Sequence, residues 1–80
     1  MAMLDKSHLL ALADEYQRVT DVSDTTLSSR IFDDGKKLPL LRGDGDLSTK
    51  RFNSTLQWFS DNWPDAAVWP RHVQRPKVAA

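Results

Sequence analysis

The sequence predicts a small, mainly all-α domain of three to four helices. The chain has 80 residues, enough for one domain with one hydrophobic core, and 40% of them are hydrophobic. Apolar residues recur at steps of three and four in three stretches, which is the spacing of a buried helix face. The glycines and prolines lie outside those stretches, so we expect turns between the helices.

The first helix is expected over residues 6–19. Asp5 or Ser7 can cap it, because a short side-chain oxygen accepts a free backbone N–H at a helix N-terminus. Apolar residues at helical spacing form its inward face: Leu9, Leu12, Ala13, Tyr16 and Val19. The polar run over 20–23 ends this helix.

The second helix is expected over residues 24–33. Ser23 or Asp24 suits its N-cap position. Leu27 and Ile31 are four residues apart and therefore share its inward face. Gly35 follows where a left-handed helix cap commonly lies.

Residues 36–47 are not expected to form a helix, because three glycines and a proline lie in this region or at its edge. Leu38, Leu40 and Leu41 favour a short extended or β segment, which Pro39 restricts to a sheet edge or a loop. The run 43–46 reads Gly-Asp-Gly-Asp and predicts a turn. A calcium loop needs further ligands and a closing Glu, which this run lacks.

The third helix begins after Ser48 or Thr49 and ends before Pro64. Its buried stripe contains Phe52, Leu56, Phe59 and Trp63, whereas Trp58 lies about 100° from Phe59 and is expected to be half covered. The whole predicted core is Leu9, Leu12, Tyr16, Leu27, Ile31, Phe52, Leu56 and Phe59. We expect one domain over residues 1–70 and a flexible C-terminal tail over 71–80, because prolines recur there and no apolar anchor is expected beyond Trp69.

Hydroxyl side chains gather around the turn between the first two helices. An apolar residue follows this turn, a small polar residue caps the next helix, and hydroxyl residues precede an apolar anchor and a cation: Val22, Ser23, Thr25, Thr26, Leu27, Ser28 and Arg30. The segment 16–32 thereby resembles the helix-turn-helix of small bacterial and phage regulators. This resemblance implies a DNA-binding transcription regulator of a mobile element or phage, acting as a homodimer whose helix 24–33 enters the major groove of double-stranded DNA.

The expected DNA-binding residues follow from this geometry, because short hydroxyl side chains at a helix N-terminus allow close approach to phosphates and base edges. They are Thr25, Thr26, Ser28, Ser29, Arg30, Lys36, Lys37, Arg42, Lys50 and Arg51. The alternative is structural: the hydroxyl groups cap a helix, and the cations belong to a solvated face neutralised by nearby aspartates.

A different class of function is also open, namely a small protein-binding regulator. Such an antiactivator or adaptor would capture a transcription factor through an apolar groove. The net charge of zero favours it, and so does the acidic N-terminal part of the chain. A structural subunit of a larger phage or mobile-element assembly is a third interpretation.

Several other functions find no support in the residues. No nucleophile, base and orienting group can be picked out, and no glycine-rich phosphate loop is present, so we expect neither an enzyme nor a cofactor. The chain has no cysteine, and His8 and His72 are far apart in sequence and expected at the surface, so no metal site is predicted. No membrane-spanning stretch or signal peptide is evident, and a cytoplasmic location is expected.

Overall fold

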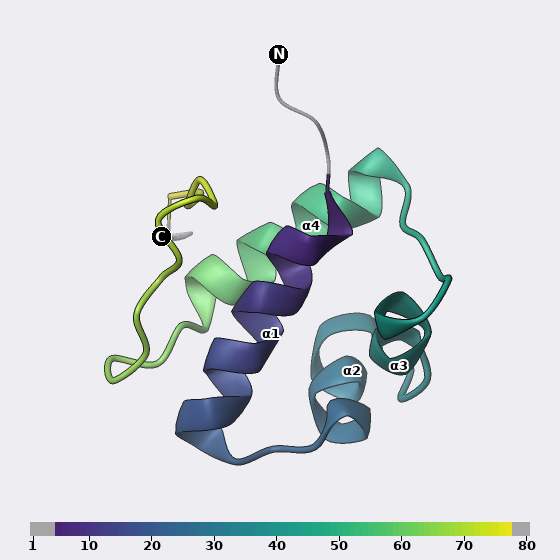
Figure 1. Cartoon of the computed structure of the whole chain (residues 1–80), viewed down its shortest axis with the longest axis horizontal. Coiled ribbons are helices and arrows are strands. Elements are labelled where there is room, and N and C mark those ends of the chain that lie inside the picture. Colours follow the sequence, from purple (N-terminus) through teal and green to yellow (C-terminus); the bar gives the residue numbers. More distant parts are fainter. Residues whose placement is uncertain (1–4, 78–80) are drawn as a thin grey trace.

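A computed structural model describes residues 5–77 and confirms the all-α prediction. The four helices are α1 (Lys6–Thr20), α2 (Asp24–Phe32), α3 (Lys37–Arg42) and α4 (Thr49–Asp61), and the described residues form no strand. The long helices α1 and α4 pack side by side, and the short helices α2 and α3 pack on each other beside α1 (Figure 1). No helix in the range 5–77 is long and apolar enough to cross a membrane.

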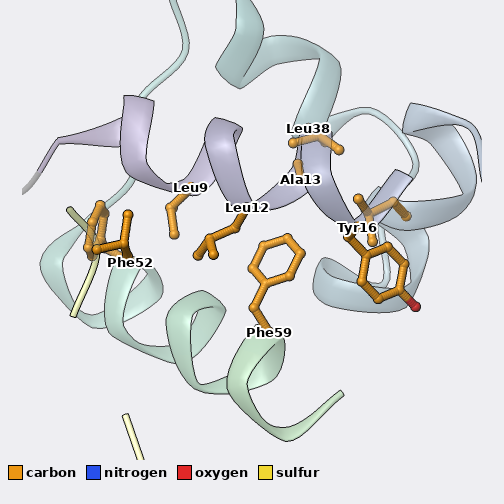
Figure 2. Close-up of a cluster of buried hydrophobic side chains, with 9 residues drawn as sticks. Leu9, Leu12, Ala13, Tyr16, Leu38, Phe52 and Phe59 are labelled. Carbon is orange, nitrogen blue, oxygen red and sulfur yellow. The ribbon is translucent and has the colours of Figure 1, made fainter. Parts of the chain in front are cut away.

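The core lies between α1 and α4 and extends to α2 and α3. Figure 2 shows Leu9 and Leu12 of α1 facing Phe52 and Phe59 of α4. The other buried apolar side chains include Ala13, Tyr16, Leu27, Leu38 and Leu41. Of the predicted core, only Ile31 and Leu56 are partly rather than fully buried, and both pack against this cluster.

Side-chain caps fix where the three longer helices begin. Asp5 accepts the Ser7 N–H, Ser23 accepts the Thr26 N–H and Ser48 accepts the Arg51 N–H. Aspartates also end two helices, because Asp21 (φ 58°) and Asp33 (φ 57°) adopt the left-handed conformation. The left-handed cap expected at Gly35 is therefore at Asp33, since Asp can adopt this conformation although less readily than Gly.

The expectation of an extended segment in place of α3 was wrong. Pro39 is the third residue of this helix, where a backbone N–H has no helical acceptor, so the proline removes no hydrogen bond. The Leu38 N–H is instead donated to the Ser28 hydroxyl of α2 at 2.9 Å. Leu38 and Leu41 are both buried, as helical spacing requires.

Two similar turns follow α4, one from Trp63 to Ala67 and one from Trp69 to Val73. Both read Trp-Pro-x-x-apolar. The indole N–H of Trp63 is donated to the Ala67 carbonyl at 3.1 Å, and that of Trp69 to the Val73 carbonyl at 2.7 Å. In both turns the apolar fifth residue is buried.

The second of these turns holds the following residues against α4. Val73 is an apolar anchor beyond Trp69, contrary to the expectation from the sequence. The Arg75 guanidinium lies 5.1 Å from the Trp69 ring centroid and is hydrogen-bonded to the Ser60 carbonyl of α4. The expected tail therefore contacts the helices through Val73, Arg75, Pro76 and Lys77, and residues 78–80 lie outside the described range.

Candidate functional site

The residues expected to bind DNA are distributed over three different environments. On α2, the side chains of Thr25, Thr26, Ser29 and Arg30 are exposed. The Thr26 hydroxyl accepts a hydrogen bond from the capping Ser23 hydroxyl, and Arg30 is bonded to the Tyr16 hydroxyl at 3.2 Å. This surface is available to a ligand, although two of its members already have partners inside the chain.

Ser28 was expected on the same surface but is fully buried. Its hydroxyl accepts a hydrogen bond from the Leu38 N–H and donates one to the Asp34 carbonyl. Ser28 uses its hydroxyl as donor and as acceptor inside the fold, and so joins α2 to the start of α3. Its buried side chain is not accessible to a nucleic acid. The hydroxyl pattern of the sequence does not distinguish this residue from its exposed neighbours.

Arg42 is the centre of an ion-pair network that joins three helices. Its guanidinium lies 2.9 Å from the Asp14 carboxylate of α1 and 2.7 Å from the Asp24 carboxylate of α2. It also bonds the Gln17 side-chain oxygen at 2.9 Å. The hydrogen bond from Arg42 holds the pKa of Asp24 below its ordinary value. Arg42 is therefore held within the fold rather than directed at a phosphate.

Lys36 and Lys37 lie at the start of α3, where Lys36 is exposed and Lys37 is partly buried. The side chains of both make no hydrogen bond or ion pair with any residue in the range 5–77. Acidic residues lie at both ends of α2: Asp21 precedes the helix, Asp24 is its first residue, and Asp33 and Asp34 follow its end. The α2 surface is thus bracketed by carboxylates.

Lys50 and Arg51 line a groove between the end of α2 and the first three turns of α4, which we call the α2–α4 groove. Its volume is about 470 Å³. Its apolar lining residues are Ile31, Phe32 and Trp58, and Ser48, Ser54 and Thr55 complete the lining. No acidic residue lines this groove, and neither cation has a side-chain partner among the described residues.

Trp58 is held at the groove by two other rings. Its ring centroid is 5.6 Å from that of Tyr16 and 5.4 Å from that of Phe59, which it meets edge to face. The expected partial exposure of Trp58 is confirmed. The sequence indicated Trp58, Lys50 and Arg51 of this groove, whereas the contribution of Ile31 and Phe32 depends on how α2 packs against α4.

Neither the run 43–46 nor the two histidines bring together enough ligands for a metal ion. The Lys6 ammonium donates hydrogen bonds to the carbonyls of Gly43 (2.6 Å) and Gly45 (2.8 Å), so a side chain of the protein closes the predicted turn. His8 and His72, which are distant in sequence, meet edge to face at 5.2 Å. Within residues 5–77, no group of three or more His, Cys, Asp or Glu side chains is arranged to hold a metal ion. Comparisons with protein-family models, curated proteins and solved structures found no match to this chain.

Proposed function

We propose that this chain is a small protein-binding regulator, of the antiactivator or adaptor kind, that captures a partner protein such as a transcription factor in the α2–α4 groove. One observation supports this most: partly buried apolar side chains line a concave surface beside two cations that have no partner among the described residues. Aromatic residues and arginine dominate the binding energy of protein interfaces, and they do so where a pocket removes water from them.

The electrostatics of α2 favour a protein partner over DNA. Phosphate binding is driven by lysine and arginine, and its strength depends on the local excess of cations. Asp21 precedes α2, Asp33 and Asp34 follow it in the sequence, and Arg42 is already paired with Asp14 and Asp24. A duplex lying along α2 would bring its phosphates close to these carboxylates.

DNA binding remains a second candidate because one observation favours it. Thr25, Thr26, Ser29 and Arg30 form an exposed surface on α2, directly after the left-handed turn at Asp21. In this proposal α2 still enters the major groove, whereas Lys36, Lys37, Lys50 and Arg51 contact the backbone. Ser28 and Arg42 would have structural roles only.

Site-specific crosslinking in the cell of origin tests the two candidates against each other. A photo-crosslinking side chain is placed at Ser54 in the groove in one variant and at Ser29 on the α2 surface in another. Our proposal predicts a defined protein adduct from position 54 and none from position 29. A DNA adduct from position 29 would support the second candidate, and the absence of any adduct from position 54 would reject the first.

Titration with a fluorescent random-sequence duplex completes the comparison. We expect no binding at micromolar protein at moderate ionic strength, because the surface around α2 is not basic. Binding that weakens steeply as NaCl is raised would show release of counterions from phosphates and would favour the DNA candidate.

A further inference from the structure

We infer that the segment captured in the α2–α4 groove is acidic and contains an aromatic or large aliphatic anchor residue. This inference rests on the proposed function and adds the chemistry of the partner. Its basis is the position, at an apolar-lined groove, of two cations without a carboxylate partner in the range 5–77. Other cations also lack such a partner within this range but do not line the groove, among them Arg30, Lys36 and Lys37. Arg18 and Arg42 have carboxylate partners, whereas Lys50 and Arg51 have none among the residues the structure describes.

The charge at this end of the groove is not balanced by its surroundings. Lys50 and Arg51 lie in the first turn of α4, which contains no acidic residue. No carboxylate lines the groove. Cations at a helix N-terminus are unfavourable for the helix itself, because the helix dipole is positive there. An acidic residue of a partner would relieve this repulsion, and the groove is therefore electrostatically complementary to an anionic segment.

The apolar part of the groove selects the second feature of the partner. A volume of about 470 Å³ is of the size that holds a compact ligand, so it suits a large side chain and its neighbours rather than a whole helix. Tyr16 and Phe59 pack on Trp58 at 5.6 and 5.4 Å between centroids. An aromatic or aliphatic side chain of a partner can fill the space beside Trp58, Ile31 and Phe32.

The spacing of the two features follows from the geometry of α4. Arg51 and Trp58 are seven residues apart on the helix, which corresponds to roughly 10 Å along its axis. An extended peptide covers that distance in about three residues. We therefore expect an Asp or Glu about three positions from the anchor residue of the bound segment.

Selection from a library of random twelve-residue peptides on the full chain tests this inference. We expect enrichment of sequences that combine Asp or Glu with Phe, Trp, Tyr or Leu at this spacing. The double charge reversal Lys50→Glu/Arg51→Glu should weaken the binding of the selected peptides at least about tenfold. The matched control Lys36→Glu/Arg71→Glu changes the net charge equally at exposed residues outside the groove, and should leave binding within about twofold.

A second pair of variants separates this inference from the proposed function. Ser54→Trp fills the groove, whereas Asn53→Trp adds the same ring at the neighbouring exposed position, which does not line it. If the selected peptides fail to bind Ser54→Trp but are neutral or basic, the inference of an acidic partner is overturned and the proposed function stands. If no peptide loses binding to Ser54→Trp while still binding Asn53→Trp, both the inference and the proposed function are overturned. A dimer in sedimentation that Ser54→Trp dissociates would identify a second copy as the occupant and likewise overturn the inference.

Discussion

At the scale of the residue, a single buried hydroxyl joins α2 to the start of α3. Ser28 accepts the Leu38 N–H at 2.9 Å, and this N–H belongs to the first turn of α3, where no helical acceptor exists. The hydroxyl therefore acts as a cap supplied by another helix. Ser29, the next residue, is exposed and has no such role.

Ser28→Ala should lower the free energy of unfolding by about 1–3 kcal/mol, because it leaves a buried N–H without an acceptor. Ser29→Ala is the matched control and should change it by less than about 0.5 kcal/mol. Urea denaturation of both variants measures the difference. Equal stabilities would mean that the Leu38 N–H finds another acceptor.

Glu15 links α1 to the turn region that follows α4. Hydrogen bonds from the Arg18 guanidinium and from the Val68 N–H lower the pKa of Glu15 from 4.5 to about 2. Because the pKa is lower in the folded state, the stabilisation is present above about pH 4.5 and is lost as the pH falls toward about 2.

Glu15→Gln should therefore flatten the fall in melting temperature between pH 4.5 and about pH 2. Asp44→Asn removes an exposed carboxylate from the loop before α4 and serves as the control. Thermal unfolding followed across this range is the measurement. If both variants keep the steep dependence of the original protein, the bonds of Glu15 do not stabilise the fold.

At the scale of the element, local signals predicted three helices and missed the fourth. The bounds of α1, α2 and α4 agree closely with the prediction, because periodic apolar residues and the caps Asp5, Ser23 and Ser48 are adjacent in sequence to the helices they define. The six residues of α3 are too few for periodicity to be evident. Pro39 also looks like a helix breaker until the position of the first turn is known, and the partner of Leu38 lies ten residues earlier.

Two neighbouring leucines distinguish α3 from the extended segment expected at this position. In the helix Leu41 is buried and Leu40 is 59% exposed, whereas a strand would place Leu38 and Leu40 on the same face. Leu41→Ala should therefore cost about 2–5 kcal/mol of stability and Leu40→Ala less than about 0.5 kcal/mol. Chemical denaturation compares them. The reverse order would indicate an extended backbone.

The turn from Trp69 to Val73 gives a second matched pair. Val73 is 4% exposed and Val68, which lies between the two turns, is 72% exposed. Val73→Ala removes about two buried methyl groups and should destabilise the protein by about 1–2 kcal/mol, whereas Val68→Ala should be nearly neutral. Differential scanning calorimetry of both variants measures this. A neutral Val73→Ala would mean that the segment after Trp69 does not pack on the domain in solution.

At the scale of the whole molecule, the candidate site depends on contacts that no local pattern contains. The α2–α4 groove combines residues 31–32 with residues 48–58, and the sequence indicated only the partial exposure of Trp58 and the cations at 50 and 51. Basic residues that look alike in sequence have different partners in space. Arg42 joins three helices, whereas Arg51 has no partner among the residues described.

The Arg42 network should hold the α2–α3 pair against α1. Arg42→Ala removes the contacts of the guanidinium with Asp14, Asp24 and Gln17. Because the guanidinium is partly exposed, we expect the free energy of unfolding to fall by only about 1–2 kcal/mol. The pKa of Asp24 should rise toward its ordinary value, which an NMR titration of its carboxyl carbon measures. Arg18→Ala is the control, because its ion pair with Glu15 lies within α1 and should matter less to the packing of the helices. If Arg42→Ala left both the stability and the pKa of Asp24 unchanged, Arg42 would not be held by this network, and its guanidinium would be free to contact a partner.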